Sequence, residues 1–382
     1  MTARPTLLAA VGDANAVATW SGTPYHLLQL ARPRGVIDRG LALEPLGRFR
    51  NVQRYLWNLG TMLHARGHGG YQYSVPCLER LWQPLGSSLA GTRILNCFQL
   101  FPPSVVADVR IEKWYYIDQT LPPLFADYGL GDNIGRWAQQ DAIAREREGY
   151  QQATGIVTHS RWAAQSLIHG YDIPASKVHV VVPGANLDAD SYSAWEAEHR
   201  IPALDSSRPL RLVFVGKDAR RKGLDRLIRA MQLARAQGAA CQLRVIGCTR
   251  ERLQPELRHV EGVEWLGFID KQRQPRAYLD AVADNDVGCL LSHAEAGGMC
   301  LREFHALGLA VIGPDVGGSP DHVIAEAAQL FAPDAADEEI AALLLRWSKN
   351  REQVQEMRAI SWARRAEAGW AHSVVQLARL WS

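Results

Sequence analysis

The stretch His293–Gly308, HAEAGGMCLREFHALG, carries two carboxylates, Glu295 and Glu303, at a spacing that suits ligand binding. The apolar run Val287–Leu291 predicts a strand before it, and we expect a helix to begin near Met299. A strand, a glycine-rich turn and a helix N-terminus make an anion site, because free backbone N–H groups and the positive end of the helix dipole point at one spot.

The two carboxylates are eight positions apart (303 − 295 = 8), so they serve different parts of a ligand. Glu295 lies on the predicted loop, and Glu303 lies about one turn into the predicted helix. One can reach the reacting part of a phosphorylated ligand and the other its hydroxyl-rich end. The alternative is an ordinary surface loop with two solvated glutamates, since short motifs match by chance.

A second loop offers the positive charge that a phosphate requires. The buried strand predicted over Leu210–Val215 is followed by GKDARRKG, which includes Lys217 and Lys222. Basic side chains and backbone N–H groups suit a diphosphate, and a carboxylate deeper in the site suits the vicinal hydroxyls of a ribose. These features predict a site for a nucleoside diphosphate with a group attached. The run Arg220-Arg221-Lys222 is alternatively a solvated face.

The first half of the chain offers a weaker ligand loop around Gly22. Leu7–Val11 predicts a strand, and a helix is expected from Pro24, with Ser21 or Thr23 as its cap. A small-residue loop at a helix start admits a phosphate or sugar close to the backbone. The loop lacks the GxGxxG pattern of dinucleotide-binding folds.

A polar triplet, Asp118-Gln119-Thr120, follows the predicted strand Trp114–Ile117. Sheets of α/β proteins place ligand groups at such carboxyl ends, although a turn aspartate can equally bond its own backbone. A group of aromatic residues lines either an acceptor groove or the core. These are Trp57, Tyr71, Tyr73, Trp82, Trp114 and Tyr115.

Strand and helix patterns alternate along both halves of the chain, which favours doubly wound parallel sheets. We expect one domain over residues 1–187 and a second over 208–360, joined by a polar linker at 188–207. Helices are also expected at 49–66 and, as one long element, at 360–380; residues 361–382 are assigned to the first domain.

Composition excludes several classes of protein. The 382 residues are 47% hydrophobic with a net charge of +2, so we expect a soluble globular protein and no nucleic-acid partner. The six scattered cysteines form no CxxC pair, which is typical of a reducing compartment and argues against a zinc site. No apolar run has the length of a membrane span. We expect a cytoplasmic location, with peripheral contact with the inner membrane face left open.

Two stretches resemble the signatures of the retaining glycosyltransferases of family 4, enzymes of the GT-B fold. They are VFVGKDARRKGLDRLIRAM and HAEAGGMCLREFHALGLAVIGPDVGG; the second matches the family's Glu-x7-Glu motif. Weaker agreement runs through THSRWAAQSL, VVPGANLD and EWLGFID. The resemblance implies two Rossmann-like domains facing a cleft, with a C-terminal helix that crosses back to the first domain.

The resemblance also implies roles for individual residues. Glu303 binds the donor ribose, Glu295 faces the transferred sugar, and Lys217 and Lys222 hold the diphosphate and stabilise its departure. The remaining implied contacts are the backbone of Gly298, Met299 and Cys300, the base-contacting Phe268 and Ile269, and Gly22 at the donor phosphates. Lys217 stands where the family usually has arginine, and Asp118 stands near the position of a family histidine, facing the sugar or acceptor.

The function implied is transfer of a sugar from a nucleotide-diphosphate donor, UDP- or GDP-sugar, to a hydroxyl of a glycan, lipid-linked or small-molecule acceptor. Configuration is retained, an α-glycosidic bond forms, no metal or cofactor is used, and polysaccharide or glycoconjugate biosynthesis is the setting. The alternatives are a non-catalytic GT-B protein that binds a nucleotide sugar or glycan, and a GT-B phosphorylase or epimerase.

Overall fold

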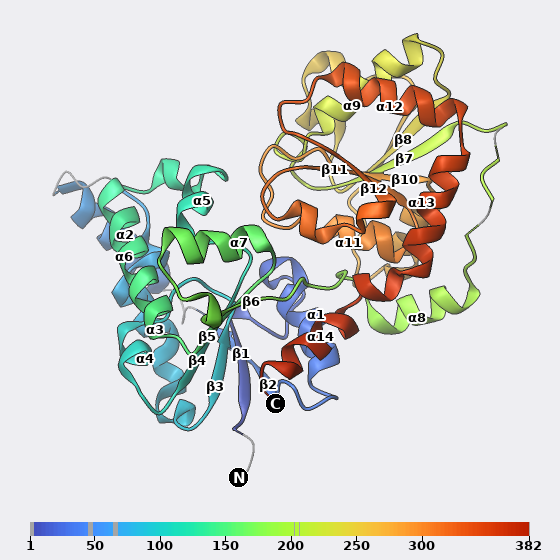
Figure 1. The fold of residues 1–382 in the computed structure, drawn as a ribbon. Coiled ribbons are helices and arrows are strands. Elements are labelled where there is room, and N and C mark those ends of the chain that lie inside the picture. The colour runs from blue at the N-terminus through green and yellow to red at the C-terminus, as the bar shows by residue number, and fades with distance from the viewer. Residues whose placement is uncertain (1–3, 45–48, 64–67, 202, 206, 382) are drawn as a thin grey trace. The chain divides into compact units, whose positions relative to one another are not determined.

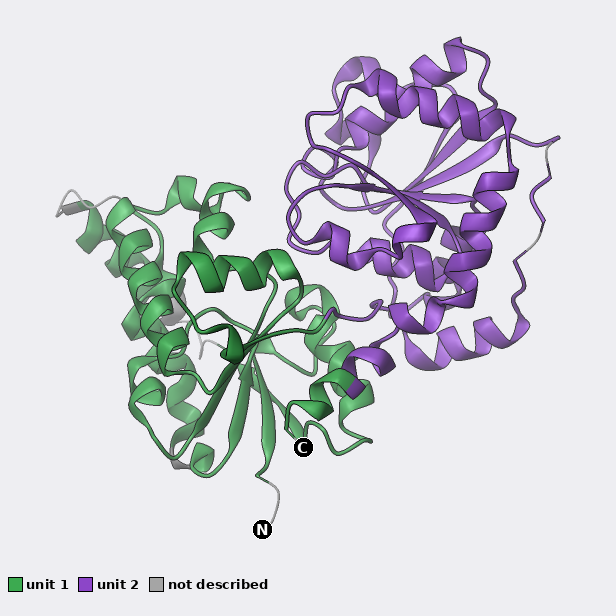
Figure 2. Ribbon diagram, viewed as in Figure 1, with its two compact units in different colours: residues 1–181, 376–382 green, residues 182–375 purple. Residues whose placement is uncertain are grey.

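The computed structural model describes residues 4–44, 49–63, 68–201, 203–205 and 207–381. The chain divides into two compact units, residues 1–181 with 376–382 and residues 182–375 (Figure 2). Each unit contains a six-stranded parallel sheet with helices packed on it, which confirms the predicted doubly wound α/β class (Figure 1).

The sheet of the first unit has the order β2-β1-β3-β4-β5-β6, so the order reverses between β1 and β3. Its strands are β1 Thr6–Asp13, β2 Arg39–Leu43, β3 Arg93–Asn96, β4 Glu112–Ile117, β5 Gly155–Thr158 and β6 Val178–Val180. Its helices are α1 Thr23–Ala31, α2 Phe49–Leu63, α3 Val75–Trp82, α4 Pro103–Ala107, α5 Leu121–Ala126, α6 Arg136–Gln152 and α7 Arg161–Gln165.

The sheet of the second unit has the order β12-β11-β10-β7-β8-β9, with the reversal between β7 and β10. Its strands are β7 Leu210–Val215, β8 Cys241–Ile246, β9 Val263–Gly267, β10 Val287–Cys289, β11 Ala310–Pro314 and β12 Ala328–Phe331. Its helices are α8 Ala189–Glu198, α9 Leu224–Ala236, α10 Pro275–Ala283, α11 Met299–Ala306, α12 Asp337–Lys349 and α13 Glu352–Ala363. Helix α14, Trp370–Arg379, runs from the second unit into the last residues of the first.

Helix α9 shows how the sequence pattern forms the core of the second unit. Leu224, Leu227, Ile228 and Met231 recur at the spacing of one helical face, and all four are fully buried. They join the same core as Phe214 of β7. Because β7 is apolar almost throughout, it occupies the centre of a sheet that is covered on both faces.

The predicted linker at 188–207 is wrong in part, because α8 forms inside it. The Asp188 side chain caps this helix by accepting a 2.9 Å hydrogen bond from the backbone N–H of Ser191. Trp195 is buried, and its indole N–H donates to Asp280 at 3.1 Å. The polar composition of the segment concealed a helix that is held by two aromatic residues, Trp195 and Tyr192, whose hydroxyl donates to Ala306 O at 2.7 Å.

The single helix predicted at 360–380 is also wrong. Helix α13 ends at Ala363, a short turn follows, and α14 begins at Trp370 after the extended residue Gly369. The end of the chain returns to the first unit, where the Trp381 ring lies edge-on to Trp114 at 5.9 Å.

Several smaller expectations differ from the structure. Strands β2 and β12 were not predicted, because RGLAL and AQLF are short and only partly buried. The cap of α1 is Gly22, in a left-handed conformation with φ 88°, and neither Ser21 nor Thr23 caps it. Helix α2 is described to Leu63; the predicted residues 64–66 lie outside the described ranges.

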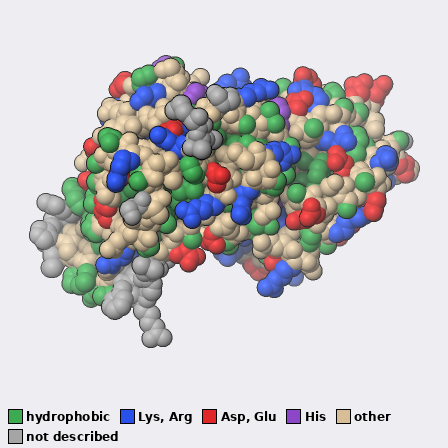
Figure 3. All heavy atoms as spheres, turned by 90° about the horizontal axis from the view of Figure 1, so that it is seen from below, with side chains coloured by type: hydrophobic (Ala, Val, Ile, Leu, Met, Phe, Trp, Pro, Cys, Tyr) green, Lys and Arg blue, Asp and Glu red, His purple; other side chains and the backbone are tan. Residues whose placement is uncertain are grey.

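The aromatic group of the first unit belongs mainly to the core. Five of its members are buried, and Trp57 is half-buried. The five are Tyr71, Tyr73, Trp82, Trp114 and Tyr115. On the face shown in Figure 3, basic and acidic side chains are interspersed.

Glu146 of α6 is a buried carboxylate that holds the start of α5. It accepts hydrogen bonds from the backbone N–H of Leu121 at 2.9 Å, from the Tyr150 hydroxyl at 2.8 Å and from the Tyr171 hydroxyl. Burial raises its pKa to about 8, although these hydrogen bonds oppose the increase. The carboxyl therefore binds its proton more tightly in the folded state than in the unfolded state.

This pKa predicts a pH-dependent contribution to stability. A group whose pKa is raised in the folded state stabilises the fold at pH values below its unfolded pKa, and this contribution is lost as pH rises through its folded pKa. For Glu146 this interval runs from about 4.5 to about 8. We expect the stability of wild type relative to Glu146→Gln to fall across that interval, measured by urea unfolding. Glu148→Gln, an exposed change on the same helix, is the control and should show no such trend. A wild-type advantage that is constant with pH would contradict the assignment.

Candidate active site

The two predicted ligand loops of the second unit meet where the strand order reverses. In the sheet, β10 pairs with β7, with Cys289 opposite Phe214. The loops that follow these strands are hydrogen-bonded to each other: Leu291 N–H donates to Lys222 O at 3.3 Å, and His293 N–H to Arg221 O at 2.9 Å. Ligands of open α/β sheets bind at such switch points, outside the carboxyl ends of the strands.

Gly223 permits this close approach of the two loops. It has φ 68°, and a Cβ atom at this position would collide with the carbonyl oxygen of Leu291. A side chain here would push the loops apart and separate Lys222 from the second loop. Glycine is required both for its conformation and for the space.

Glu295 is a buried carboxylate neutralised by cations from the other loop. Its Oε2 atom lies 3.4 Å from Lys222 Nζ and 3.4 Å from Arg221 Nη1, and Ser292 Oγ donates to it at 3.1 Å. Burial opposes its charge, but Lys222 and Arg221 outweigh that effect and hold its pKa below the usual value. Burial likewise opposes the charge of Lys222, whose pKa is nevertheless raised by Glu295.

Helix α11 begins directly beyond this ion pair. Its cap, Gly298, has φ 75° and no side chain, so the first-turn N–H groups of Met299 and Cys300 receive no side-chain cap. Burial raises the pKa of the Cys300 thiol to about 11, so this cysteine stays neutral at physiological pH. The charges of both Lys222 and Glu303 act on the thiol, which therefore lies near both groups.

Glu303 is almost fully buried one turn into α11, and both of its oxygens already have partners. Oε1 accepts from Lys271 Nζ at 2.5 Å, and Oε2 accepts from the Tyr278 hydroxyl. Lys271 is one-third exposed, with its ammonium 4.4 Å from the Tyr278 ring centroid. Sequence reasoning missed both partners; the lysine directly after EWLGFID, at 264–270, was the only available signal.

Lys217 and Phe268 come together from the loops after β7 and β9. The Lys217 ammonium lies 4.7 Å from the centroid of the Phe268 ring, a cation–π contact. Phe268 is 62% exposed, and Ile269 packs partly against the core. An exposed aromatic ring beside a cation is available for stacking against a flat ligand.

Gly22 and Asp118 belong to the first unit. The half-buried Asp118 lines a cavity of about 250 Å³ together with Cys97 and Trp20. Trp20 precedes Gly22 closely, was missed by the sequence reasoning, and stacks on His159 at 5.0 Å. Its φ of 42° is unusual for a residue with a side chain, and such strain gathers at functional sites.

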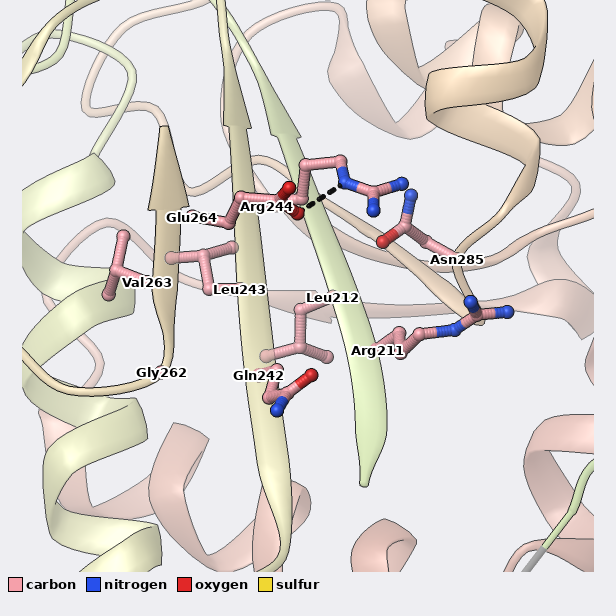
Figure 4. A pocket seen from close by; sticks show the side chains of 9 residues that line it. All are labelled: Arg211, Leu212, Gln242, Leu243, Arg244, Gly262, Val263, Glu264 and Asn285. Carbon is pink, nitrogen blue, oxygen red and sulfur yellow. Dashed lines mark hydrogen bonds and ion pairs between the residues drawn. The ribbon is translucent and has the colours of Figure 1, made fainter. Parts of the chain in front are cut away.

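Another pocket of the second unit lies at the opposite, amino-terminal edge of its sheet. Side chains from the starts of β7, β8 and β9 line it (Figure 4). Its arginines are paired: Arg244 Nε lies 2.8 Å from Glu264, and Arg211 Nη1 lies 2.6 Å from Asp284. It is separate from the loops that carry Lys222 and Glu295.

Three of the four aspartates in the Asp-x-Asp triplets of the sequence, 188–190 and 284–286, have partners within the fold. Asp188 caps α8, Asp284 pairs with Arg211, and Asp286 pairs with Arg208 at 2.8 Å. Across the described ranges, no three His, Cys, Asp or Glu side chains form a group that could hold a metal ion.

Comparison with known proteins confirms the family predicted from the sequence. Residues 196–362 match the family Glycosyl transferases group 1. The D-inositol 3-phosphate glycosyltransferase of Gordonia bronchialis is 26% identical over 187 residues, which is 46% of this chain and 40% of that protein. The amylovoran biosynthesis glycosyltransferase of Erwinia amylovora is 27% identical over 192 residues, or 47% and 44%. These matches therefore span less than half the length of either relative.

Solved structures match over nearly the whole chain and confirm the predicted GT-B fold. Sucrose-phosphate synthase from Thermosynechococcus elongatus has a TM-score of 0.66 at 17% identity, covering 99% of this chain and 98% of that one. Anabaena HepE, solved in complex with UDP, has a TM-score of 0.65 at 16% identity and 99% coverage of both chains.

The ion pair of Lys222 and Glu295 predicts a specific loss of stability. In Lys222→Met the buried carboxylate keeps only Arg221 and Ser292, so we expect a loss of about 1–3 kcal/mol at neutral pH. Because the folded pKa of Glu295 is depressed, this contribution is present above its unfolded pKa and is lost as pH falls through the folded value. Urea unfolding at neutral and acid pH measures both effects.

The matched control is Arg220→Met, which removes an exposed charge from the same loop. It should change the free energy of unfolding by no more than about 0.5 kcal/mol. Equal losses in the two variants, or a Lys222→Met loss that persists in acid, would show that the pair does not carry the effect.

Proposed function

We propose that this protein is a retaining glycosyltransferase that moves a sugar from a nucleotide-diphosphate donor to an acceptor hydroxyl, forming an α-glycosidic bond. The observation that supports it best is the cluster at the second unit's switch point, where Lys222 and Glu295 adjoin the N-terminus of α11. The family match over residues 196–362 favours the same activity.

In this proposal the donor diphosphate lies against Lys217, Lys222 and the backbone N–H groups of Gly298, Met299 and Cys300. Charge-assisted hydrogen bonds and the helix dipole offset the cost of desolvating the diphosphate. Because Glu295 neutralises part of the positive charge, the loops hold their cations in place before a ligand arrives.

Glu303 binds the donor ribose in this proposal. Each carboxylate oxygen accepts more than one hydrogen bond, so its bonds to Lys271 and Tyr278 leave capacity for two ribose hydroxyls. Phe268 and Ile269 contact the base. UDP is the first choice of nucleotide because HepE, a neighbour in fold, was solved with it.

The chemical step is breakage of the bond between the sugar C1 and the diphosphate oxygen. Both electrons of the bond leave with the oxygen, and C1 becomes oxocarbenium-like. Lys217, Lys222 and the first turn of α11 stabilise the departing charge. The acceptor hydroxyl attacks from the same face, and its proton passes to the departing phosphate oxygen, so configuration is retained.

Glu295 orients the transferred sugar in this mechanism, and its depressed pKa keeps it anionic and able to accept from ring hydroxyls. Gly22 contacts the donor phosphates, and Asp118 orients the sugar or the acceptor. A glycan, a lipid-linked compound or a small molecule serves as acceptor.

Nucleotide binding is the first test. UDP at about 100 times its dissociation constant should add roughly 2.7 kcal/mol to the folded state, seen as a thermal shift. The shift caused by UDP should largely disappear in Glu303→Gln and persist in Glu338→Gln, an exposed change on α12. GDP, ADP, CDP and dTDP complete the panel. An unchanged UDP shift in Glu303→Gln would exclude the ribose role.

Stereochemistry tests the reaction itself. A UDP-α-sugar donor that responds in the panel should be hydrolysed slowly by water without an acceptor, and NMR should detect the α-anomer first. Lys222→Ala should reduce this rate about 100-fold or more, because it removes charge stabilisation of the leaving group, whereas Arg220→Ala should not. The β-anomer as first product would overturn the retaining mechanism, and binding without any turnover would favour the non-catalytic alternative.

A further inference from the structure

A cavity of the first unit lies where the strand order of its sheet reverses. It has a volume of about 250 Å³, and its lining residues come from the carboxyl ends of β1, β3 and β4 and from the segment before α1. Ligands of open α/β sheets bind at such switch points. Because this volume is at the small end of the range for ligand pockets, the cavity has room for a single ring.

Gln119 gives this cavity a buried polar atom without a partner. The residue is 2% exposed, and its Oε1 atom has no hydrogen-bond partner among the described residues. Its backbone is fixed, since Gln99 Nε2 donates to Gln119 O at 3.1 Å and the adjacent Thr120 Oγ1 lies 2.8 Å from Ser166 Oγ. A buried oxygen without a hydrogen bond costs free energy, so it indicates a ligand that supplies one.

The charge in the cavity favours an uncharged ligand. The Asp118 carboxylate lines it, and this negative charge adds to the effect of burial in raising the pKa of the Cys97 thiol. None of the described residues that line the cavity is a lysine, an arginine or a histidine. A phosphate group there would therefore face a like charge with no cation to neutralise it.

Hydroxyl groups suit both polar side chains of the cavity. A hydroxyl donates to the Asp118 carboxylate, and it pairs with the Gln119 amide whichever way the amide is turned, because it both donates and accepts. A ligand with several hydroxyls on one small ring can satisfy both side chains at once. Sugars and cyclitols have this chemistry.

Two aromatic rings, Trp20 and Phe98, supply apolar walls of the cavity. Trp20 stacks on the buried His159 at 5.0 Å between ring centroids, and Phe98 stacks on Tyr73 at 5.9 Å with 10° between the ring planes. These contacts hold both rings in place. The face of a sugar ring presents C–H groups that pack on an aromatic ring, while its hydroxyls remain available to polar side chains.

We propose that this cavity binds the acceptor through an uncharged sugar or cyclitol ring, with Gln119 and Asp118 each holding a ring hydroxyl. A ring that carries phosphate is excluded. The acceptor role rests on the proposed sugar transfer, in which Glu295 already orients the transferred sugar. A glycan or lipid chain joined to the ring lies outside the cavity. None of the helices that the structure describes is long and apolar enough to cross a membrane.

Saturation-transfer difference NMR on the full chain tests this proposal, because it detects weakly bound ligands. The compounds form matched pairs: glucose, mannose and galactose with their 6-phosphates, and myo-inositol with its 1-phosphate. We expect at least one neutral member to bind, and its phosphorylated partner to bind more weakly by about tenfold or more, since Asp118 repels the phosphate. Glucosamine is added as a cationic compound.

Two variants separate the polar contacts. Gln119→Leu should weaken binding of the neutral ring roughly tenfold, because it removes a buried hydrogen bond. Asp118→Asn keeps an acceptor oxygen but removes the charge, so it should reduce the preference for the neutral member over its phosphate. A merely structural role for Asp118 would weaken both members equally. Asp127→Asn, an exposed change at the end of α5, is the matched control and should leave the preference unchanged.

The proposal is wrong if no neutral compound binds, if a phosphorylated member binds as well as its neutral partner, or if glucosamine binds more tightly than every neutral ring. Displacement of the bound ring by UDP-glucose but not by UDP would assign the cavity to the donor sugar and also overturn it. All variants should keep the UDP thermal shift. A neutral ring that binds as expected, with no thermal shift from any nucleotide, would support the ring site and overturn the proposed transfer instead.

Discussion

The parallel pairing of β10 with β7 is the constraint on which the candidate site depends. It joins the loops after these strands, so that the backbone of Leu291 and His293 donates to Lys222 and Arg221. The two loops come from positions about seventy residues apart in the chain, and only the crossover in strand order makes them neighbours. The sheet topology therefore brings the two loops together independently of their side chains.

The charged side chains of the cluster offset for one another the free-energy cost of burying a charge. A buried carboxylate or ammonium alone is costly, because it gives up its hydration. Glu295 and Lys222 reduce this cost for each other, and Arg221 pairs both with Glu295 and, at 3.6 Å, with Asp218. Glu303 repeats the arrangement with Lys271 and Tyr278. Such a cluster keeps its charged groups in fixed positions without leaving a lone charge in the protein interior.

The sequence was sufficient for the features that periodicity and short motifs encode. The apolar run of β7, the helical face of α9 and the start of α11 at Met299 all follow from local patterns. The partners of Glu303 do not, since Lys271 and Tyr278 come from a loop and a helix 25 or more positions away. Helix α8 was missed because its anchors, Trp195 and Tyr192, bond to partners that are remote in sequence, Asp280 and the backbone of Ala306.

Helices α9 and α2 show what helical periodicity in the sequence does not predict. The apolar faces of α9 and α2 both recur at helical spacing, yet that of α9 is fully buried and that of α2 is exposed. Periodicity states that a helix has an apolar side, but it does not state what covers that side. For α9 the sheet beneath supplies the cover. For α2, the hydrogen bond that Trp57 donates and those that Gln53 and Asn58 accept hold the polar side inward, so the apolar side stays exposed among the residues that the structure describes.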